Sequence, residues 1–142
     1  MKLLERTGYP WVESDGGRAL SKRPKQKNDC TVRAVALVFS LSYDKAYEML
    51  KSAGRKSHDG FYINEWADEV LINGKRLRWQ PFQAIKGQKR MNPVTFAQQF
   101  NKGRWIVRTA GHVFAFIDGV AYDDIREPDG RCIYGAWELV DA

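Results

Sequence analysis

The residues of this chain that are best suited to covalent chemistry are one cysteine, one histidine and two neighbouring aspartates. Cys30 begins an apolar segment with a helical pattern, His112 begins an apolar segment typical of a strand, and Asp123 and Asp124 follow shortly after it. A thiol nucleophile needs a base beside it, and that base needs a partner that fixes its orientation. The pattern therefore predicts Cys30 as the nucleophile, His112 as the base that takes the thiol proton, and Asp123 as the group that orients the imidazole.

The sequence around Cys30 favours a reactive thiol. The predicted helix runs from Cys30 to about Leu41 and is apolar nearly all round, with Arg33 as the exception, which is typical of a helix buried inside a domain. Asp29 is the expected N-cap of this helix. A cysteine in the first turn gains from the helix dipole, which favours the thiolate. The alternative is that Cys30 is a small buried apolar residue, as many free cysteines are.

The spacing of His112 and Asp123 fits a two-stranded hairpin. The dipeptide Asp118-Gly119 lies between two alternating apolar segments and is a strong signal for a two-residue turn. In that register Phe114 lies opposite Asp123, and Asp123 is the diagonal neighbour of His112 on the same face of the sheet. A slip of one residue would bring Asp124 to that face instead. We therefore expect Asp123 to orient the imidazole, with Asp124 in reserve.

The oxyanion that forms when a thiolate attacks a carbonyl group needs hydrogen-bond donors. The backbone N–H of Cys30 is one natural donor, and the side-chain amide of Gln26, four residues upstream, or of Asn28 could supply the second. Asn28 is in reserve, since it is equally well interpreted as an ordinary polar loop residue. His58 is the competing base, but its Ser-His-Asp-Gly loop offers no strand to position it, so we expect a surface position.

The composition predicts that the chemistry depends on side chains of this chain, without a metal ion or a cofactor. Two cysteines, Cys30 and Cys132, are too few for a disulfide framework, and with His58 and His112 they show no metal-ligand clustering, so we expect no metal and no cofactor. No apolar segment approaches the ~20 residues needed to span a bilayer, and residues 1–20 lack the pattern of a secretory signal. We expect a protein of a reducing cytoplasm, with a protein or peptide substrate and no membrane contact.

The chain is basic, with a formal net charge of +6. Much of this charge lies in two tracts, 18–27 and 75–90, which indicate either a patch for nucleic acid or an acidic protein, or two solvated loops. We favour solvated loops, because 17 acidic residues are interspersed and no nucleic-acid-binding motif accompanies the charge. Under the nucleic-acid hypothesis, the candidate contacts are Arg104, Arg108, Trp79 and Trp105.

The order of the elements predicts one α+β domain over residues 1–142. After an irregular arm at 1–29, attached to the body through Trp11 and Val12, helical patterns come first and antiparallel strand patterns come last. We expect N-terminal helices, with the cysteine helix buried, packed on a C-terminal antiparallel sheet. The predicted helices are 30–41, 44–54, 64–71 and 93–103, and the predicted strands are 76–79, 104–109, 112–117, 120–124 and 137–140.

The segments 26–41 and 103–124 resemble the papain-like cysteine peptidase superfamily, in which a cysteine at a helix start precedes a histidine on a strand and then a carboxylate. Residues 28–36 are similar to the nucleophile helix of ovarian-tumour-type deubiquitinases, which also carry Cys-x-x-Arg-Ala. The Gln-x-x-Asp-Cys start and the Gly-His-Val-Phe-Ala-Phe-Ile-Asp-Gly segment look like bacteriocin-processing peptidases and small phage or bacterial papain-like proteins. The resemblance implies a papain-like fold, Gln26 as oxyanion donor, and a phage-encoded protein acting in the host cytoplasm.

The leading hypothesis is a cysteine hydrolase, a peptidase or isopeptidase that uses a Cys-His-Asp triad and a thioester acyl-enzyme. The same triad serves deamidases, transglutaminases and acyltransferases, and the fold does not choose among them. A first alternative is a non-catalytic binding protein on a papain-like scaffold, with Cys30 unreactive and buried away from His112. A second is a basic nucleic-acid-binding protein, which predicts binding that depends steeply on salt.

Overall fold

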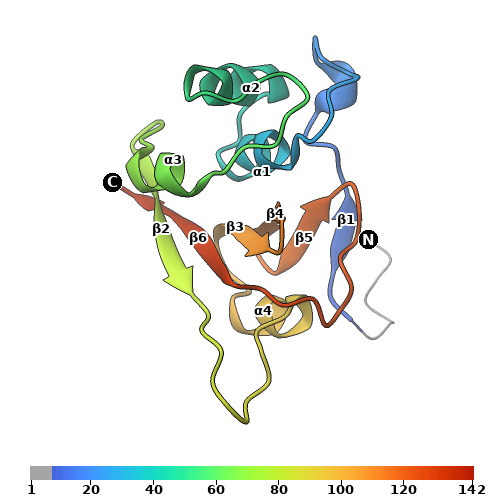
Figure 1. Ribbon diagram of the computed structural model, residues 1–142, viewed down its shortest axis with the longest axis vertical. Helices are drawn as coiled ribbons and strands as arrows, with labels where there is room; N and C mark the ends of the chain where they lie inside the picture. The colour runs from blue at the N-terminus through green and yellow to red at the C-terminus, as the bar shows by residue number, and fades with distance from the viewer. Residues whose placement is uncertain (1–7) are drawn as a thin grey trace.

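The computed structural model describes residues 8–142, which form a mixed α+β structure (Figure 1). In this part of the chain, six strands form one sheet that is accompanied by four α-helices and one short 3-10 helix, so the α+β fold class is confirmed. The helices are α1 (Cys30–Val38), α2 (Tyr43–Ser52), α3 (Asn64–Glu69) and α4 (Pro93–Gln99), and the 3-10 helix η1 is Arg18–Leu20. The strands are β1 (Trp11–Glu13), β2 (Lys75–Pro81), β3 (Arg104–Thr109), β4 (His112–Ile117), β5 (Val120–Asp123) and β6 (Gly135–Asp141).

The strand order in the sheet is β1-β5-β4-β3-β6-β2. Neighbouring strands run antiparallel except β1 and β5, which run parallel. The hairpin of β4 and β5 has the expected two-residue turn, because Ile117 pairs with Val120 across Asp118 and Gly119. Both turn residues have left-handed backbone conformations, with φ of 49° and 81°, as a type I′ turn requires. The predicted register of this hairpin is therefore confirmed.

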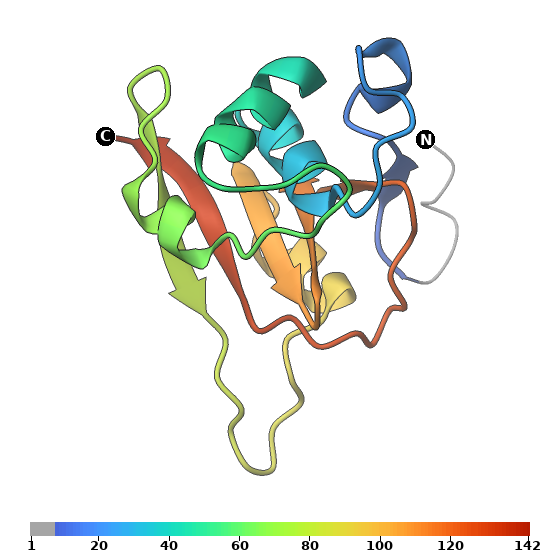
Figure 2. The same cartoon turned by 45° about the horizontal axis from the view of Figure 1, so that its top comes forward.

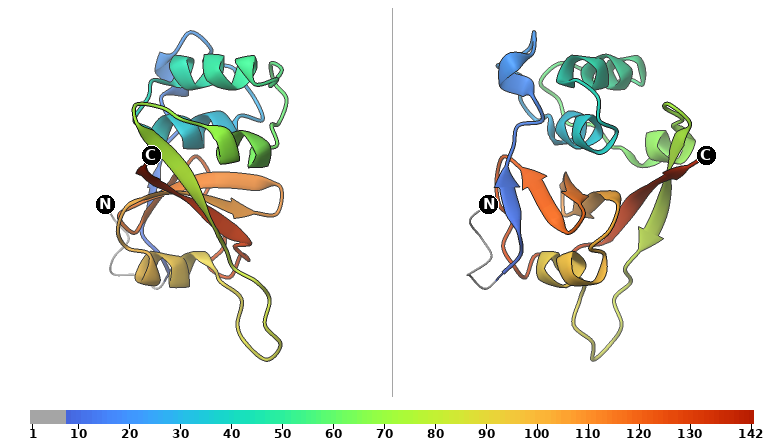
Figure 3. Two further views of the ribbon diagram at one scale, coloured as in Figure 1. Left: turned by 90° about the vertical axis from the view of Figure 1, so that its left-hand side faces the viewer. Right: turned by 180° about the vertical axis from the view of Figure 1, so that it is seen from behind.

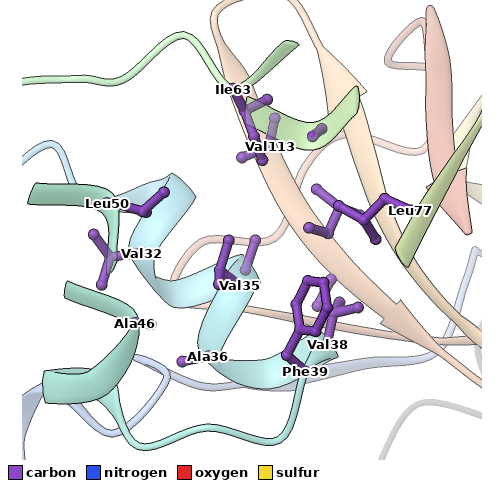
Figure 4. Packing of buried hydrophobic residues seen from close by; sticks show 14 of the residues in the cluster. Val32, Val35, Ala36, Val38, Phe39, Ala46, Leu50, Ile63, Leu77 and Val113 are labelled. Carbon is purple, nitrogen blue, oxygen red and sulfur yellow. The ribbon is translucent and has the colours of Figure 1, made fainter. Parts of the chain in front are cut away.

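The sheet is the middle of three layers. Helices α1 and α2 lie on one side of the sheet and α4 lies on the other, as Figures 1 and 3 show. The first core packs Val32, Val35 and Val38 of α1 against the sheet, where Val113 of β4 is one of their partners (Figure 4). The second core, between α4 and the opposite face, is rich in aromatic side chains around Phe96. Burial of α1 between α2 and the sheet explains its apolar pattern on all sides.

Helix α1 ends at Val38, three residues earlier than expected. Ser40 adopts a left-handed conformation with φ of 56°, which interrupts the helical path. Arg104 of β3 donates hydrogen bonds to the carbonyl oxygens of Leu37 (2.5 Å) and Val38 (2.7 Å). These bonds satisfy two of the carbonyl groups that the end of a helix leaves without partners. The end of α1 is therefore tied to the sheet by a side chain that lies far along the chain.

Two of the four candidate nucleic-acid contacts belong to the protein's own structure. Trp105 is buried, and its Nε1 donates to the carbonyl oxygen of Lys102 at 2.9 Å. The guanidinium of Arg104 is bound to the end of α1. Burial of Trp105 and the internal hydrogen bonds of both side chains therefore count against these two residues as candidate contacts under the nucleic-acid hypothesis.

The N-terminal arm is more regular than expected within its described residues, 8–29. Its segment Trp11–Glu13 forms β1, and Trp11 pairs with Ala121 and Val12 with Tyr122 of β5. The predicted attachment of the arm through Trp11 and Val12 is thus confirmed. The prediction that this segment is irregular is wrong. A strand of three residues whose partner lies at the other end of the chain carries no local sequence pattern.

The segment between α2 and α3, residues 53–63, runs beside the start of α1 (Figure 2). It follows α2, which begins with Ser42 as a true N-cap: the Ser42 hydroxyl accepts a hydrogen bond from the Lys45 backbone at 3.1 Å. The start of α1 therefore lies where three parts of the chain meet, namely the arm, this segment and the β4–β5 hairpin.

Within the described residues, no helix has both the length and the apolar character that crossing a bilayer requires.

Candidate active site

Cys30 is the first residue of α1, and its side chain is half-buried. This position leaves its backbone N–H without an acceptor inside the helix. Burial acts to raise the pKa of the thiol, but hydrogen bonds with the His112 imidazole and the Val113 backbone, together with the charges of His112 and Arg33, bring that pKa below its ordinary value. Because the thiolate is the nucleophilic form, these surroundings favour a reactive Cys30.

His112 is the first residue of β4, and Asp123, the last residue of β5, lies beside it. The distance between His112 Nε2 and Asp123 Oδ2 is 2.6 Å. Since Asp123 engages Nε2, Nδ1 is the ring nitrogen left for Cys30. Burial acts to lower the pKa of His112, but hydrogen bonds to Asp123 and Cys30 and the charges of both residues raise it to about 10. The imidazole is therefore protonated at neutral pH.

Together, Cys30, His112 and Asp123 favour a thiolate–imidazolium pair. A protonated imidazole donates from both ring nitrogens, so one N–H can serve the thiolate while the other serves the carboxylate. The ring plane is further held by stacking on Phe114, with the ring centroids 5.8 Å apart. An arrangement of this kind supplies a nucleophile and a general acid to the same reacting bond.

Arg33 lies behind this set of side chains and binds three carboxylates. Its Nη1 is 2.6 Å from Asp123 Oδ1 and 2.8 Å from Asp124 Oδ1, and its Nε is 3.1 Å from Asp29 Oδ1. Arg33 is 7% exposed and Asp123 is 3% exposed. Buried carboxylates need such partners, because leaving water disfavours their charge. Arg33 thus holds Asp123 through Oδ1 and leaves Oδ2 for His112.

Asp29 occupies the N-cap position of α1, but its side chain does not cap the helix. Its carboxylate accepts hydrogen bonds from Arg33, from Arg18 (3.0 Å) and from the hydroxyl of Tyr43 (2.7 Å). Burial acts to raise the pKa of Asp29, yet these bonds and the two guanidinium charges hold it below its ordinary value. The prediction that the Asp29 side chain caps α1 is wrong. Its carboxylate oxygens accept hydrogen bonds from two guanidinium groups and a hydroxyl instead of from the helix N–H groups.

Asp124 lies in the same network without contacting His112. Its Oδ1 is 2.8 Å from Arg33 Nη1, and its Oδ2 is 3.8 Å from Arg18 Nη1. Its backbone N–H donates to Asp123 Oδ1 at 2.9 Å. In the structure, His112 is therefore paired with Asp123. The reserve candidate Asp124 is bound to Arg33 and Arg18 instead.

Gln26 and Asn28 are tied to the loop that contains His58. Gln26 Oε1 accepts from the His58 backbone N–H at 2.5 Å, and Gln26 Nε2 donates to Ser57 Oγ at 3.3 Å. Asn28 Nδ2 donates to the His58 carbonyl oxygen at 2.8 Å. Gln26 lines the same cavity as Cys30, and its amide retains one hydrogen for a further acceptor. His58 is exposed, as expected, and the contacts of its loop hold the segment that precedes Cys30.

Three positioning residues have no role in the predictions made from the sequence. Arg33 is the one charge in an apolar helix, and a buried charge at such a position needs a carboxylate partner. Arg55 is 4% exposed and donates to the carbonyl oxygens of Lys27 (3.0 Å) and Asn28 (3.4 Å), which braces the segment before the nucleophile. Gly16 has a left-handed φ of 69°, and a Cβ there would lie 2.9 Å from Arg33 Cα, so only glycine lets the arm lie so close to α1.

A cavity of about 810 Å³ opens at Cys30 and His112, and a second cavity of about 290 Å³ opens on another side of the same two residues. Within residues 8–142, no group of three or more His, Cys, Asp or Glu side chains is placed to hold a metal ion. The chain matches no protein-family model, no curated protein and no solved structure.

Proposed function

We propose that this protein is a papain-like cysteine hydrolase that cleaves a peptide or isopeptide bond. The observation that supports the proposal most directly is the 2.6 Å contact between His112 Nε2 and Asp123 Oδ2, with Cys30 and His112 lining the same open cavity. The surroundings of Cys30, His112 among them, bring the pKa of its thiol below the ordinary value. A buried helix that begins with the cysteine, followed by a strand that begins with the histidine, is also the arrangement of papain-like enzymes. Both cysteines, Cys30 and Cys132, are free, as a thiol enzyme of a reducing cytoplasm requires.

In the proposed reaction, the Cys30 thiolate attacks the carbonyl carbon of the scissile bond and forms a tetrahedral intermediate. The negative oxygen accepts hydrogen bonds from the Cys30 backbone N–H and from the free amide hydrogen of Gln26. The His112 imidazolium then gives its Nδ1 proton to the leaving amine, the C–N bond breaks, and a thioester remains on Cys30. Asp123 keeps Nε2 protonated throughout, so Nδ1 is the nitrogen that exchanges the proton.

Deacylation uses the same groups in reverse. Neutral His112 takes a proton from water, the resulting hydroxide attacks the thioester carbon, and the acid product leaves as Cys30 returns to the thiolate. An amine in place of water would give a transferase, and a side-chain amide in place of a peptide bond would give a deamidase. The nature of the product therefore distinguishes these activities, while the residues and their roles stay the same.

The Cys30→Ala variant is expected to lose at least about a thousandfold in turnover, since it removes the nucleophile. The wild-type protein is incubated with a proteome-derived peptide library, and the products are identified by mass spectrometry as cleaved, deamidated or amine-linked peptides. Removal of the Sγ atom at a half-buried position should leave the circular dichroism spectrum and Tm nearly unchanged.

The matched control is Cys132→Ala, which removes the other free thiol and should retain activity. Products that appear equally with wild-type protein and with Cys30→Ala would contradict the proposal. A wild-type protein that leaves unchanged both this library and a matched set of peptides branched through a Lys side chain would contradict it as well.

A further inference from the structure

Two cavities share lining residues at Cys30, and together they are called the cleft below. The larger cavity, of about 810 Å³, and the smaller, of about 290 Å³, are both lined by Cys30, His112, Gly60 and Gly111. The space beside both glycines is open, because a Cβ atom at either position would meet no atom within 4 Å. A substrate chain in an extended conformation therefore has room on both sides of the thiol.

The larger cavity carries positive charge at its rim. Lys25 and Lys27 line this cavity, and both residues are exposed. Of the ion pairs formed within residues 8–142, none involves either lysine. The two ammonium groups are therefore available to an anionic ligand.

Four further charged side chains of this cavity, two arginines and two aspartates, bind one another. Arg18 and Arg33 are held by Asp29 and by Asp124, at distances between 2.8 and 3.8 Å. These four residues compensate each other in sign, so the charge they present to a ligand is small. The two rim lysines thus dominate the charge that a ligand meets at the entrance.

The smaller cavity combines an aromatic side chain with a third cation. Tyr62 is 71% exposed at this cavity, which is a high value for a large aromatic residue. The Arg108 guanidinium lies 5.4 Å from the Tyr62 ring centroid, and its Nη2 donates to the Tyr62 hydroxyl at 3.2 Å. Phe61 and Ile63 line the same cavity. This side of the cleft suits an apolar or planar side chain with a carboxylate near it.

We propose that this cleft binds an acidic peptide segment, with carboxylates at Lys25 and Lys27 and an apolar or aromatic side chain beside Tyr62. The claim that this peptide is the substrate rests on the proposed function. Binding of the peptide itself requires no chemistry at Cys30. Ile125, exposed at the larger cavity, adds apolar contact on that side. Cations at the rim also speed the encounter with an anionic chain, and salt weakens this effect.

A second basic tract of the chain provides a matched control. Lys86 and Lys89 are exposed and lie in the loop between β2 and α4, which projects away from α1 (Figure 1). Neither lines the two cavities at Cys30. Reversal of both charges changes the net charge of the protein by the same amount as reversal at Lys25 and Lys27.

Binding is measured by fluorescence anisotropy with the Cys30→Ala protein, so that no turnover consumes the probe. The probe is a short fluorescein-labelled peptide rich in Glu and Tyr, and its counterpart carries Gln in place of Glu. We expect the acidic peptide to bind more tightly than the Gln peptide and to weaken as salt is added. The variant Lys25→Glu/Lys27→Glu should bind it about tenfold more weakly, and Lys86→Glu/Lys89→Glu should bind it as before.

Equal binding of the acidic and Gln peptides would overturn the inference. So would equal losses in the two charge-reversed variants, since these would indicate attraction to the net charge rather than to the cleft. Binding that is lost only in Lys86→Glu/Lys89→Glu would assign the acidic partner to the projecting loop instead.

A labelling experiment separates failure of this inference from failure of the proposed function. In a Cys132→Ala background, Cys30 reacts with the anionic sulfonatoethyl methanethiosulfonate and with the cationic trimethylammonioethyl methanethiosulfonate, each displacing methanesulfinate to form a disulfide. We expect the anionic-to-cationic rate ratio to fall about tenfold in Lys25→Glu/Lys27→Glu. A reactive thiol with an unchanged ratio overturns the inference alone, and an unreactive thiol in a protein that binds the acidic peptide overturns the hydrolase alone.

Discussion

Replacement of Arg33 by methionine is expected to lower the free energy of unfolding by about 3–5 kcal/mol. The variant keeps the apolar stem of the side chain but removes the only guanidinium that binds Asp29, Asp123 and Asp124 together within the described residues. Two of these carboxylates are nearly inaccessible to water, at 2% and 3% exposure, so water cannot replace the lost partner. Urea denaturation at neutral pH measures the change.

The matched control is Arg78→Met, which removes the ion pair between Arg78 and Glu138 on the exposed side of β2. Its expected effect is below about 1 kcal/mol, because solvent screens exposed pairs. If Arg33→Met does not fold, Arg33→Lys keeps the charge but cannot bridge three carboxylates, and an intermediate loss of stability is expected. Equal stability of wild type and both Arg33 variants would mean that this residue does not hold the site together.

The Asp123→Ala variant is expected to react with iodoacetamide about a hundredfold more slowly than wild type at pH 6. Without the carboxylate, the pKa of His112 falls from about 10 toward its ordinary value of 6.5, and the imidazolium no longer stabilises the Cys30 thiolate. An ordinary thiol with a pKa near 8.5 is less than about 1% thiolate at pH 6. The measurement is made in a Cys132→Ala background, in which Cys30 is the one cysteine.

The same substitution should alter the dependence of stability on pH. The pKa of folded His112, about 10, lies above the ordinary 6.5, so its protonation stabilises the folded protein fully below pH 6.5. This stabilisation is lost as the pH rises through 10. The difference in unfolding free energy between wild type and Asp123→Ala should therefore be largest near pH 6 and become smaller toward pH 10. A difference that grows with pH would contradict the protonated imidazole.

Asp124→Ala is the control for Asp123→Ala. It removes a carboxylate that also binds Arg33, but it leaves the contact between His112 and Asp123 in place. Cys30 should stay reactive at pH 6 in this variant. The opposite outcome, with Asp124→Ala slow and Asp123→Ala fast, would reverse the roles of the two aspartates.

The contact between His112 and Asp123 was within reach of sequence reasoning because it depends on local information. The dipeptide Asp118-Gly119 specifies a two-residue turn, and the turn specifies the register of the strands on either side. The α+β class was also predictable, since periodicities near 3.6 and 2 residues occupy separate parts of the chain.

The network behind the site was not predictable in the same way. The partners of Arg33 come from one turn earlier in the chain and from the distant end of β5, and only the packing of α1 on the sheet brings them together. Asp29 has a sequence position typical of an N-cap, but buried cationic partners outcompete the helix N–H groups for its carboxylate. β1 likewise depends on a partner strand that no local pattern reveals. The Arg33 network and β1 were therefore not predictable, because they depend on ion pairs and strand pairing between distant parts of the chain.

The most direct test of the central claim is the pH dependence of Cys30 alkylation, compared between the wild-type site and His112→Ala in a Cys132→Ala background. With the wild-type site, we expect fast alkylation well below pH 8, because the imidazolium of His112 lowers the pKa of the thiol. In His112→Ala, alkylation should become slow at low pH and rise only near pH 8.5, the ordinary range of a free thiol. Slow alkylation in both proteins, with the same rise near pH 8.5, would show that Cys30 and His112 do not form a reactive pair and would contradict the proposed hydrolase.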